Sequence, residues 1–556
     1  MNLIKNVPGK KCFLTILVSL LIVTAVAQKP RRSVLYNLVM QKKEHAIVFH
    51  DLSVFTRNHR DFHLNKDNRA GAIGTGLTLN RFTIAHILHA RHEAITVSIP
   101  SADGTVYTLE LTEQKINVSG DFSFGTINQQ HKRIKTSSDQ GLHYRGFVQG
   151  DSTSFATVSF FSNGDMMGIF SNAMGNFNIG KDSTGADYTV YNSNDMALSS
   201  TFECNTLDVP PAVTANFPPV NSSPPPIAAD SPVPALLCKK VRVYLEGSYS
   251  LYWYNFHSDL TATQNYLTGL FNQVAAMYEN EGIMVELAST YVWTTPDPYD
   301  STRSDSALFQ FQRRWNNLGD NFNGDIAQLV FGGANPVKGG IAYLLPDLCI
   351  RNFAYSYSNV FGFYNNVPAY SWDVNVVTHE IGHLFGSHHT HWCGWRTGAG
   401  GTCGAIDNCH SEESGNGCTN SCPALTDTAT RPPGWQGTVM SYCHADFGIG
   451  INLANGFGPL PQAVIRSQVS SANCLTGTVE SWSGTTSTAW EDATNWSCGK
   501  VPDTNTDVSI SQGAPNMPVV NSNAQCHSLT APSGTSVNIN DGQSLNVSGA
   551  GPVQSP

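Results

Sequence analysis

The stretch that decides the fold of the central part of the chain reads His379-Glu380-Ile381-Gly382-His383-Leu384-Phe385-Gly386-Ser387-His388-His389. On a helix, His379 and His383 are one turn apart and project from the same face, so their imidazoles can converge on one ion. Glu380 is rotated off that line and can reach a water molecule instead. Gly386 suits the left-handed conformation that ends a helix, and the reversal brings His389 back as a third ligand. Three neutral protein ligands leave one position for water, which is typical of a catalytic zinc site.

The spacing of these residues is specific. Five fixed positions at about one in twenty each give a chance match on the order of 10⁻⁴ in a chain of this size. A single histidine is more often an ordinary surface or core residue, and this interpretation applies to the histidines that lie off the spacing. We expect these to lie beside the ligands or at the surface: His388, His391, His410 and His444.

The residues around this stretch predict an α/β pattern. Residues 371–385 form an amphipathic helix with Ser371 or Asp373 as its cap, because Val374, Val377, Ile381 and Leu384 fall on one face. Alternating or continuous apolar runs upstream predict strands, and runs of helical period predict helices. The expected elements are strands at 240–245 and 326–331 and helices at 258–280 and 304–318.

The N-terminus predicts export. Lys5, Lys10 and Lys11 precede an apolar run at 13–23, and Ala25-Val26-Ala27 is a small-x-small cleavage site. Residues 1–27 therefore read as a secretory signal peptide, with Gln28 as the new N-terminus. An uncleaved membrane anchor is the alternative, but the apolar run is short for a span of about 20 residues. We expect a secreted protein with no transmembrane segment in the mature chain.

Changes in composition divide the rest of the chain into segments, so we expect a multidomain protein. Residues 28–207 alternate apolar and polar positions, as at 94–99 and 155–160, which predicts a β-rich domain. Residues 208–235 are rich in proline and nearly uncharged, and they read as a linker open to proteolytic cleavage. Residues 236–478 carry the α/β pattern. Residues 479–556 predict a small all-β module with strands at 507–510, 537–539 and 545–547.

Charge and cysteine content restrict the function. The net charge of −10, without a basic cluster after the N-terminus, argues against a nucleic-acid partner. Thirteen cysteines in an exported chain predict disulfide bonds. A structural zinc site built from four thiolates is the alternative, and the irregular spacing disfavours it. Its candidate ligands are Cys393, Cys403, Cys409, Cys418 and Cys422.

The histidine stretch resembles the motif of the metzincin zinc metallopeptidases, H-E-x-x-H-x-x-G-x-x-H with a later methionine turn. Gly437-Thr438-Val439-Met440-Ser441-Tyr442-Cys443 is similar to that turn. The resemblance implies that Met440 forms a hydrophobic floor beneath the zinc ion. It also implies that Tyr442 is a switchable fifth ligand that can stabilise the transition state.

Within the metzincins, the chain most resembles the reprolysin (adamalysin-like) branch. Residues 325–330 and 340–344 are similar to its central strands and its substrate-aligning edge strand. Thr390 stands where that branch usually has an aspartate after the third histidine. The motif followed by Thr390 and a nearby cysteine is also similar to the pappalysin branch, as is the Met-x-Tyr turn. The implied fold of the catalytic domain is a twisted, mostly parallel sheet with an antiparallel edge strand and an active-site helix, followed by an irregular, disulfide-rich half.

The resemblance extends weakly upstream, where His143-Tyr144-Arg145-Gly146 is similar to reprolysin propeptides. In that family a propeptide cysteine can bind the zinc ion and block the water site. Cys204 is the candidate here. Twelve mature cysteines can also all pair, so Cys204 as a zinc ligand and Cys204 in a disulfide are both open.

These observations predict a secreted zinc endopeptidase that is made as a proenzyme and acts on protein or peptide substrates. Glu380 is its expected general base, and the substrate would extend along the edge strand at 339–344. Calcium at Asp407, Glu412 and Glu413 is a weaker alternative to a solvated loop. Two other classes stay open: a surface adhesive protein, which makes its contacts to cells or matrix through the C-terminal module, and an inactive binding protein. The intact Glu380 disfavours the latter.

Overall fold

The computed structural model describes most of the chain after the N-terminus. The described residues are 32–44, 46–63, 73–136, 139–182, 185, 187–195, 204–214, 234, 236–317, 322–333, 339–364, 367–415, 417–418, 421–445 and 448–549. The predicted signal peptide and most of the predicted linker lie outside them. Within the described residues, none of the helices combines the length and the apolar character that a membrane span requires.

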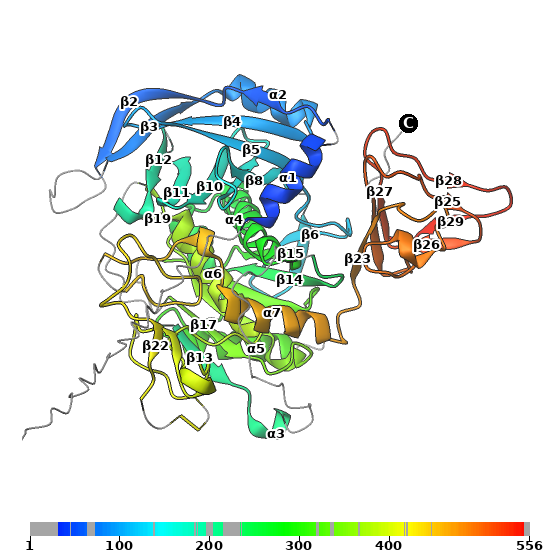
Figure 1. The fold of residues 1–556 in the computed structure, drawn as a ribbon. Coiled ribbons are helices and arrows are strands. Elements are labelled where there is room, and N and C mark those ends of the chain that lie inside the picture. Colours follow the sequence, from blue (N-terminus) through cyan, green and yellow to red (C-terminus); the bar gives the residue numbers. More distant parts are fainter. Residues whose placement is uncertain are drawn as a thin grey trace, which may run out of the picture. The chain divides into compact units, whose positions relative to one another are not determined.

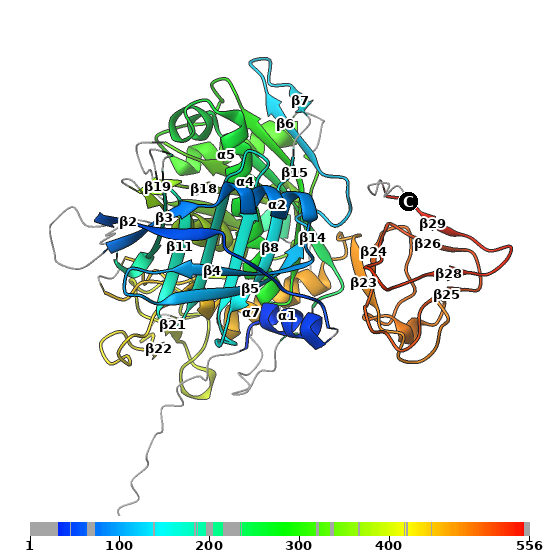
Figure 2. The same cartoon turned by 90° about the horizontal axis from the view of Figure 1, so that it is seen from above.

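The N-terminal region forms a ten-stranded sheet that is antiparallel except between β1 and β4. Strands β4 and β5 cross the direction of β8 and β11 in Figure 2, so the sheet is strongly curled. The predicted strands at 94–99 and 155–160 are β4 and β9. In spatial order the strands are β1 (His50–Leu52), β4 (Ala94–Pro100), β5 (Val106–Gln114), β8 (Leu142–Val148), β9 (Phe155–Phe160), β10 (Met166–Asn172), β11 (Gly175–Lys181), β12 (Tyr188–Asn192), β3 (Ile73–Leu79) and β2 (Phe55–His63).

A second sheet of eight strands carries the metal-binding motif on the helix that covers it. All neighbouring strands are parallel except at β17–β18 and β6–β7, which agrees with the expected mostly parallel sheet and antiparallel edge strand. In spatial order the strands are β13 (Cys204–Asp208), β17 (Gly340–Leu344), β18 (Tyr355–Asn359), β16 (Ile326–Phe331), β14 (Lys240–Gly247), β15 (Met284–Trp293), β6 (Ser123–Ile127) and β7 (Arg133–Thr136).

Three strands of this sheet come from residues that the sequence assigns to the β-rich N-terminal domain. Strands β6 and β7 extend the sheet beyond β15, and β13 lies on the opposite edge beside β17. The N-terminal residues therefore contribute strands to both sheets. Parallel pairing such as β15–β6 joins strands that are distant in the sequence and leaves no local pattern there.

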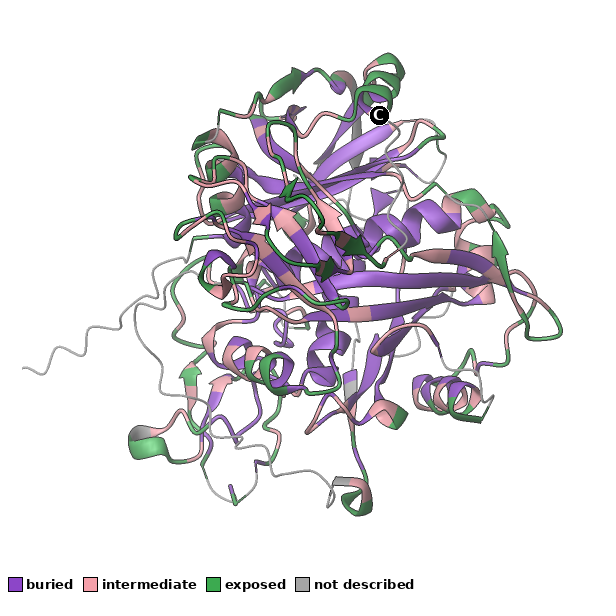
Figure 3. Cartoon of the chain, turned by 90° about the vertical axis from the view of Figure 1, so that its right-hand side faces the viewer, coloured by how far each residue is buried: buried purple, intermediate pink, exposed green. Residues whose placement is uncertain are grey.

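Helix α4 (Leu260–Asn280) lies between the two sheets and contacts β8, β9 and β10 on one side and β15 on the other (Figure 1). Asp259 caps it by accepting a hydrogen bond from the backbone N of Ala262. The sheets and the helices packed between them are buried, and exposed residues gather in the outer helices and loops (Figure 3). A buried ion pair joins Arg145 of β8 to Glu279 of α4 at 2.8 Å.

The helix that carries the histidine motif is α6 (Tyr370–Leu384). Neither Ser371 nor Asp373 caps it, since the helix begins one residue before Ser371 and its N-cap residue makes no side-chain cap. Asp373 is buried and accepts hydrogen bonds from the backbone N of Phe361 at 2.8 Å and from the hydroxyl of Tyr266 at 2.9 Å. It therefore ties the first turn of α6 to its surroundings. Burial raises the pKa of Asp373 to about 7.

The remaining helices lie around these layers. The predicted helix at 304–318 is α5, which ends one residue earlier. Their bounds are α1 (Val34–Glu44), α2 (Arg81–Ala90), α3 (Pro211–Thr214), α5 (Ser304–Asn317) and α7 (Pro459–Ser471), with short turns η1 (Ser193–Asp195), η2 (Leu251–Asn255), η3 (Arg351–Phe353), η4 (Ala399–Gly401), η5 (Leu453–Asn455) and η6 (Ala493–Asn495).

The segment after α6 is irregular and held by disulfide bonds. Its short strand pair is β21 (Ala405–Asp407) with β22 (Ala424–Thr426), and another short pair, β19 (Phe363–Tyr364) with β20 (Val367–Pro368), precedes α6. Three disulfides lie within this segment, Cys393–Cys422, Cys403–Cys418 and Cys409–Cys443. Two others join more distant parts of the chain, Cys238–Cys498 and Cys349–Cys474. All five cysteines of the alternative thiolate zinc site are paired, so that alternative is wrong.

The C-terminal residues form a small β-structure around three buried tryptophans, Trp482, Trp490 and Trp496. A disulfide links Cys498 of this part to Cys238, just before β14, and the buried Nζ of Lys240 contacts the Asp507 carboxylate. Its strands are β23 (Thr478–Trp482), β24 (Thr506–Ile510), β25 (Val519–Val520), β26 (Ala524–Cys526), β27 (Ser528–Thr530), β28 (Asn538–Ile539) and β29 (Leu545–Val547).

Candidate metal centre and active site

The three histidines of the motif converge on one point. Nε2 of His383 lies 3.1 Å from Nε2 of His379 and 3.1 Å from Nε2 of His389. His379 and His383 stand one turn apart on α6, and the chain then reverses at Gly386, whose φ is 81°. This reversal places His389 opposite the helix, as the sequence predicts. All three side chains are buried.

The outer ring nitrogens of two of these histidines point at backbone carbonyls. Nδ1 of His379 donates to the carbonyl of Val439 at 2.7 Å, and Nδ1 of His383 donates to that of Ser387 at 2.7 Å. Because a carbonyl can only accept, each Nδ1 must carry the proton, and the lone pair of the neutral imidazole is on Nε2. Burial lowers the pKa of both imidazoles, so both are neutral. Neutral imidazoles with converging lone pairs are a metal-binding set.

A fourth donor completes this set. Sγ of Cys204 lies 3.6 Å from Nε2 of His383, and the sulfur and the three nitrogens all lie within 4.8 Å of one another. Tetrahedral zinc with ligand distances of about 2.0 Å for nitrogen and 2.3 Å for sulfur requires about 3.3 Å between two nitrogens and about 3.5 Å between nitrogen and sulfur. The residues present therefore fit a zinc ion with three imidazoles and one thiolate.

Cys204 reaches the site from β13, the strand paired in parallel with β17, where it lies opposite Gly340. The Tyr442 hydroxyl donates to the backbone carbonyl of Cys204. The structure therefore places Cys204 at the histidines and not in a disulfide. Among the described residues, the other free cysteine is Cys526, and Cys238 pairs with Cys498.

Glu380 lies beside the histidines with a fully buried carboxyl group. Neither carboxylate oxygen has a hydrogen-bond partner among the described residues, apart from the nearby Cys204 thiol. Burial raises the pKa of Glu380 well above its usual value. A Cβ atom on Gly340 would lie 2.0 Å from Oε1 of Glu380, so any side chain at this position of β17 would displace the carboxyl. A buried carboxyl without a fixed partner is suited to moving a proton.

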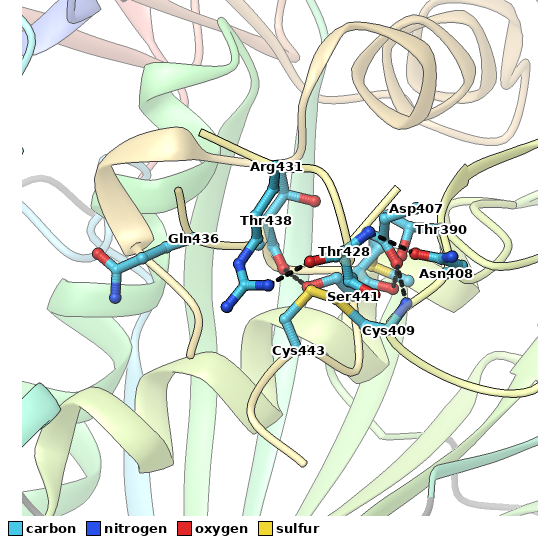
Figure 4. The surroundings of a disulfide bond; sticks show 12 residues. Thr390, Asp407, Asn408, Cys409, Thr428, Arg431, Gln436, Thr438, Ser441 and Cys443 are labelled. Atoms are coloured by element: carbon cyan, nitrogen blue, oxygen red, sulfur yellow. Dashed lines mark hydrogen bonds between the residues drawn. A yellow bond between two sulfur atoms is a disulfide. The ribbon is translucent and has the colours of Figure 1, made fainter. Parts of the chain in front are cut away.

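The methionine turn lies directly beneath α6. Met440 is fully buried, and a Cβ atom on Gly382 would lie 2.8 Å from its sulfur, so the turn approaches the helix closely. Thr390 links the turn to the third histidine, since its backbone N donates to the carbonyl of Met440 at 3.1 Å. The disulfide Cys409–Cys443 links the end of the turn to the loop that precedes it in the sequence (Figure 4).

The sequence reasoning missed the contact of Glu413 with the ligand histidine. Oε1 of Glu413 lies 2.5 Å from Nδ1 of His389 and 3.2 Å from Nε2 of His391. Glu413 stands in an irregular loop that has no periodic pattern, so no local signal in the sequence could have indicated this contact.

The calcium alternative is not supported. Among the described residues, the three acidic side chains fall into three different groups of nearby potential ligands. Glu413 faces the histidines, Glu412 lies near Cys393 and Cys422, and the buried Asp407 accepts a hydrogen bond from the backbone N of Cys409 at 3.2 Å.

The histidines outside the motif lie around the site, as expected. The His388 ring stacks on Trp392, with ring centroids 3.6 Å apart. The rings of His391, His410 and His444 lie 4.8, 4.9 and 5.6 Å from the ring of Tyr442.

Comparison with known proteins identifies this region. Residues 239–446 match the sequence model of the family described as Metallo-peptidase family M12. The chain carries a zinc metallopeptidase domain of family M12. The match covers both strands of the reprolysin resemblance, the histidine motif and the methionine turn, so the metalloendopeptidase prediction is confirmed. Residues 481–555 match a family described as a domain of unknown function.

The solved structures that resemble this chain share little sequence with it. Metalloproteinase-II from Bacteroides fragilis is 13% identical, with 53% of this chain and 81% of that chain covered and a TM-score of 0.27. A structure described as a chaperone–substrate complex is 13% identical, with 27% of this chain and 24% of that chain covered and a TM-score of 0.20. A search of curated proteins finds none with a significant match.

Proposed function

We propose that the chain is the latent precursor of an exported zinc endopeptidase. His379, His383 and His389 hold the zinc ion, Glu380 is the general base, and Cys204 occupies the fourth ligand position until the enzyme is activated. The observation that carries this proposal is the convergence of three imidazole Nε2 atoms and one thiol within 4.8 Å. Such a set binds zinc strongly at neutral pH.

The chemistry of peptide hydrolysis follows from these residues. A zinc ion held by His379, His383 and His389 would supply Lewis-acid chemistry: it would activate water as a nucleophile and polarise the scissile carbonyl. Glu380 takes a proton from the attacking water and passes it to the leaving amine nitrogen. The buried position of Glu380 beside the histidines supports this role, since among the described residues only the Cys204 thiol interacts with its carboxyl, and that thiol leaves on activation. The hydroxyl of Tyr442 is available for the developing oxyanion once Cys204 has left.

Latency follows from the position of β13. An extended substrate would add main-chain hydrogen bonds to the edge strand β17. Strand β13 already occupies that edge, with Cys204 opposite Gly340 and Asp208 opposite Leu344. The same strand engages the Tyr442 hydroxyl. Activation therefore requires displacement of β13, and a cut in the predicted linker at 208–235 would allow it.

X-ray absorption at the zinc edge tests this proposal on the intact chain. The full-length protein should show one zinc ion with three nitrogen ligands and one sulfur ligand. Cys204→Ser should lose the sulfur contribution, whereas Cys526→Ser should keep it, because Cys526 is a second buried free thiol. A zinc site without sulfur in the parent protein would contradict the proposed latency. A parent protein that binds no zinc would contradict the proposed function.

A further inference from the structure

His389 differs from His379 and His383 in the group that accepts the hydrogen bond from its Nδ1. His379 and His383 donate their Nδ1 protons to backbone carbonyls, but Nδ1 of His389 points at the Glu413 carboxylate at 2.5 Å. We propose that Glu413 is a positioning residue that orients His389 and strengthens it as a zinc ligand. This inference rests on the proposed zinc site and adds to it a residue outside the histidine motif.

The hydrogen bond fixes the state of the His389 ring. A carboxylate can only accept, so the proton of neutral His389 resides on Nδ1 and its Nε2 lone pair faces the other two imidazoles. A negatively charged acceptor also raises the electron density of the ring more than a carbonyl does, which strengthens the bond of the opposite nitrogen to a metal ion. Glu413 therefore contributes both orientation and charge.

The carboxylate that contacts Nδ1 of His389 does not come from the residue that follows it, Thr390. The backbone N of Thr390 donates to the Met440 carbonyl, and the carbonyl of Thr390 accepts from the backbone N of Ile406 at 2.7 Å. Thr390 is thus bound to the methionine turn and to the loop. The carboxylate arrives instead from Glu413, 24 residues beyond His389.

The loop holds Glu413 in place by its own backbone. The backbone N of Glu413 donates to the His391 carbonyl at 3.2 Å, and the backbone N of Cys393 donates to the Glu413 carbonyl at 2.9 Å. The indole of Trp392 donates to the carbonyl of Ser414 at 3.1 Å. The disulfides Cys393–Cys422 and Cys403–Cys418 close the loop around this bridge. The fold therefore holds the backbone of Glu413 in a defined position, as expected for a residue that positions a ligand.

His391 shares the same carboxylate oxygen. Its Nε2 lies 3.2 Å from Oε1 of Glu413, and its ring stacks parallel to that of His389, with centroids 5.0 Å apart. The buried His391 ring thus fills the space beside Glu413 and His389 and limits the conformations of both. Orientation by a fixed carboxylate is what a metal-binding imidazole requires.

The proposal is tested by measuring the zinc affinity of the full-length chain in competition with a chromophoric chelator. Glu413→Gln keeps an acceptor oxygen but loses the charge, and Glu413→Ala loses both. We expect zinc affinity to fall by about 10- to 100-fold, with the larger loss for alanine, as for other partners of metal-binding histidines. Glu412→Gln removes the same charge from the adjacent exposed residue, and its affinity should stay within about twofold of the parent value.

Thermal melting of the zinc-free variants separates positioning from a fold defect. If Glu413 only positions His389, the zinc-free Glu413→Gln variant should have nearly the same melting temperature as the zinc-free parent. Added zinc should raise the melting temperature of the variant less than that of the parent. If the alanine variant does not fold, the glutamine variant decides. If Glu413→Gln binds zinc as tightly as the parent, the proposed role of Glu413 is wrong, but the proposed zinc site is not affected. A parent chain that binds no zinc would overturn the proposed function as well.

Discussion

Sγ of Cys204 lies 3.6 Å from Nε2 of His383, although 179 residues separate the two in the sequence. Strand β13 brings them together by pairing with the edge strand β17. The same pairing covers the edge that an extended substrate would use. One strand therefore supplies both a zinc ligand and a block to substrate binding in the proposed latent enzyme.

Replacing Cys204 should increase the activity of the uncleaved chain. Cys204→Ser removes the thiolate, so water can occupy the fourth position of the proposed zinc site. We expect the initial rate on a generic protein substrate to rise by about tenfold or more, which corresponds to about 1.4 kcal/mol. Cys526→Ser is the matched control and should leave the rate unchanged. An unchanged rate for Cys204→Ser would show that this thiol does not maintain latency.

Substitution of Gly340 should impair catalysis while leaving the zinc ligands intact. The added Cβ of Gly340→Ala would lie 2.0 Å from Oε1 of Glu380, so the carboxyl must move away from its position. Loss of a correctly placed general base typically costs about 100- to 10,000-fold in rate. We expect kcat of the activated enzyme to fall toward this range with zinc content unchanged. Retention of full kcat would exclude the proposed position of Glu380 during catalysis.

Cleavage of the linker should not by itself separate the two parts of the chain. Strands β6 and β7 pair with strands of the catalytic sheet whether or not β13 is displaced, and the buried Arg145–Glu279 ion pair joins β8 to α4. After proteolysis between residues 215 and 233, the two fragments should co-elute in size-exclusion chromatography and separate only in denaturant. Separate elution under native conditions would show that the shared sheet does not hold the fragments together.

The stability of the chain should depend on pH through Asp373. Burial raises its pKa to about 7 in the folded state, against 3.8 ordinarily. The folded chain therefore holds the proton between these values while the unfolded chain releases it, so this group favours unfolding increasingly as pH rises from about 4 to about 7. Asp373→Asn cannot ionise, and its melting temperature should fall less across this range than that of the parent. Parallel pH profiles for parent and variant would contradict the raised pKa.

Short-range patterns predicted the elements that carry the metal-binding motif. The helices α4 and α6 and the strands β14 and β16 were predicted within two residues at each end, because their apolar positions recur with a local period. The turn at Gly386 followed from the conformational freedom of glycine. These features depend on neighbouring residues, so one sequence is enough to identify them.

Contacts between distant segments could not be predicted in the same way. The pairing of β15 with β6, the Cys238–Cys498 disulfide and the contact of Glu413 with His389 each depend on how the whole chain packs. The sequence offers Asp373 as one of two possible caps because of its position, but its carboxylate binds the preceding loop and Tyr266. Tertiary packing decided each of these cases.

The central claim is that Glu380 moves the proton at a zinc centre held by the three motif histidines. Its most direct test compares the linker-cleaved parent, freed from β13, with Glu380→Gln, and assays hydrolysis of a generic protein substrate and bound zinc on the same samples. The account predicts about one zinc ion per chain in both proteins, chelator-sensitive hydrolysis by the parent, and a loss of about 100-fold or more in the variant. Equal hydrolysis by parent and variant at equal zinc content would contradict it.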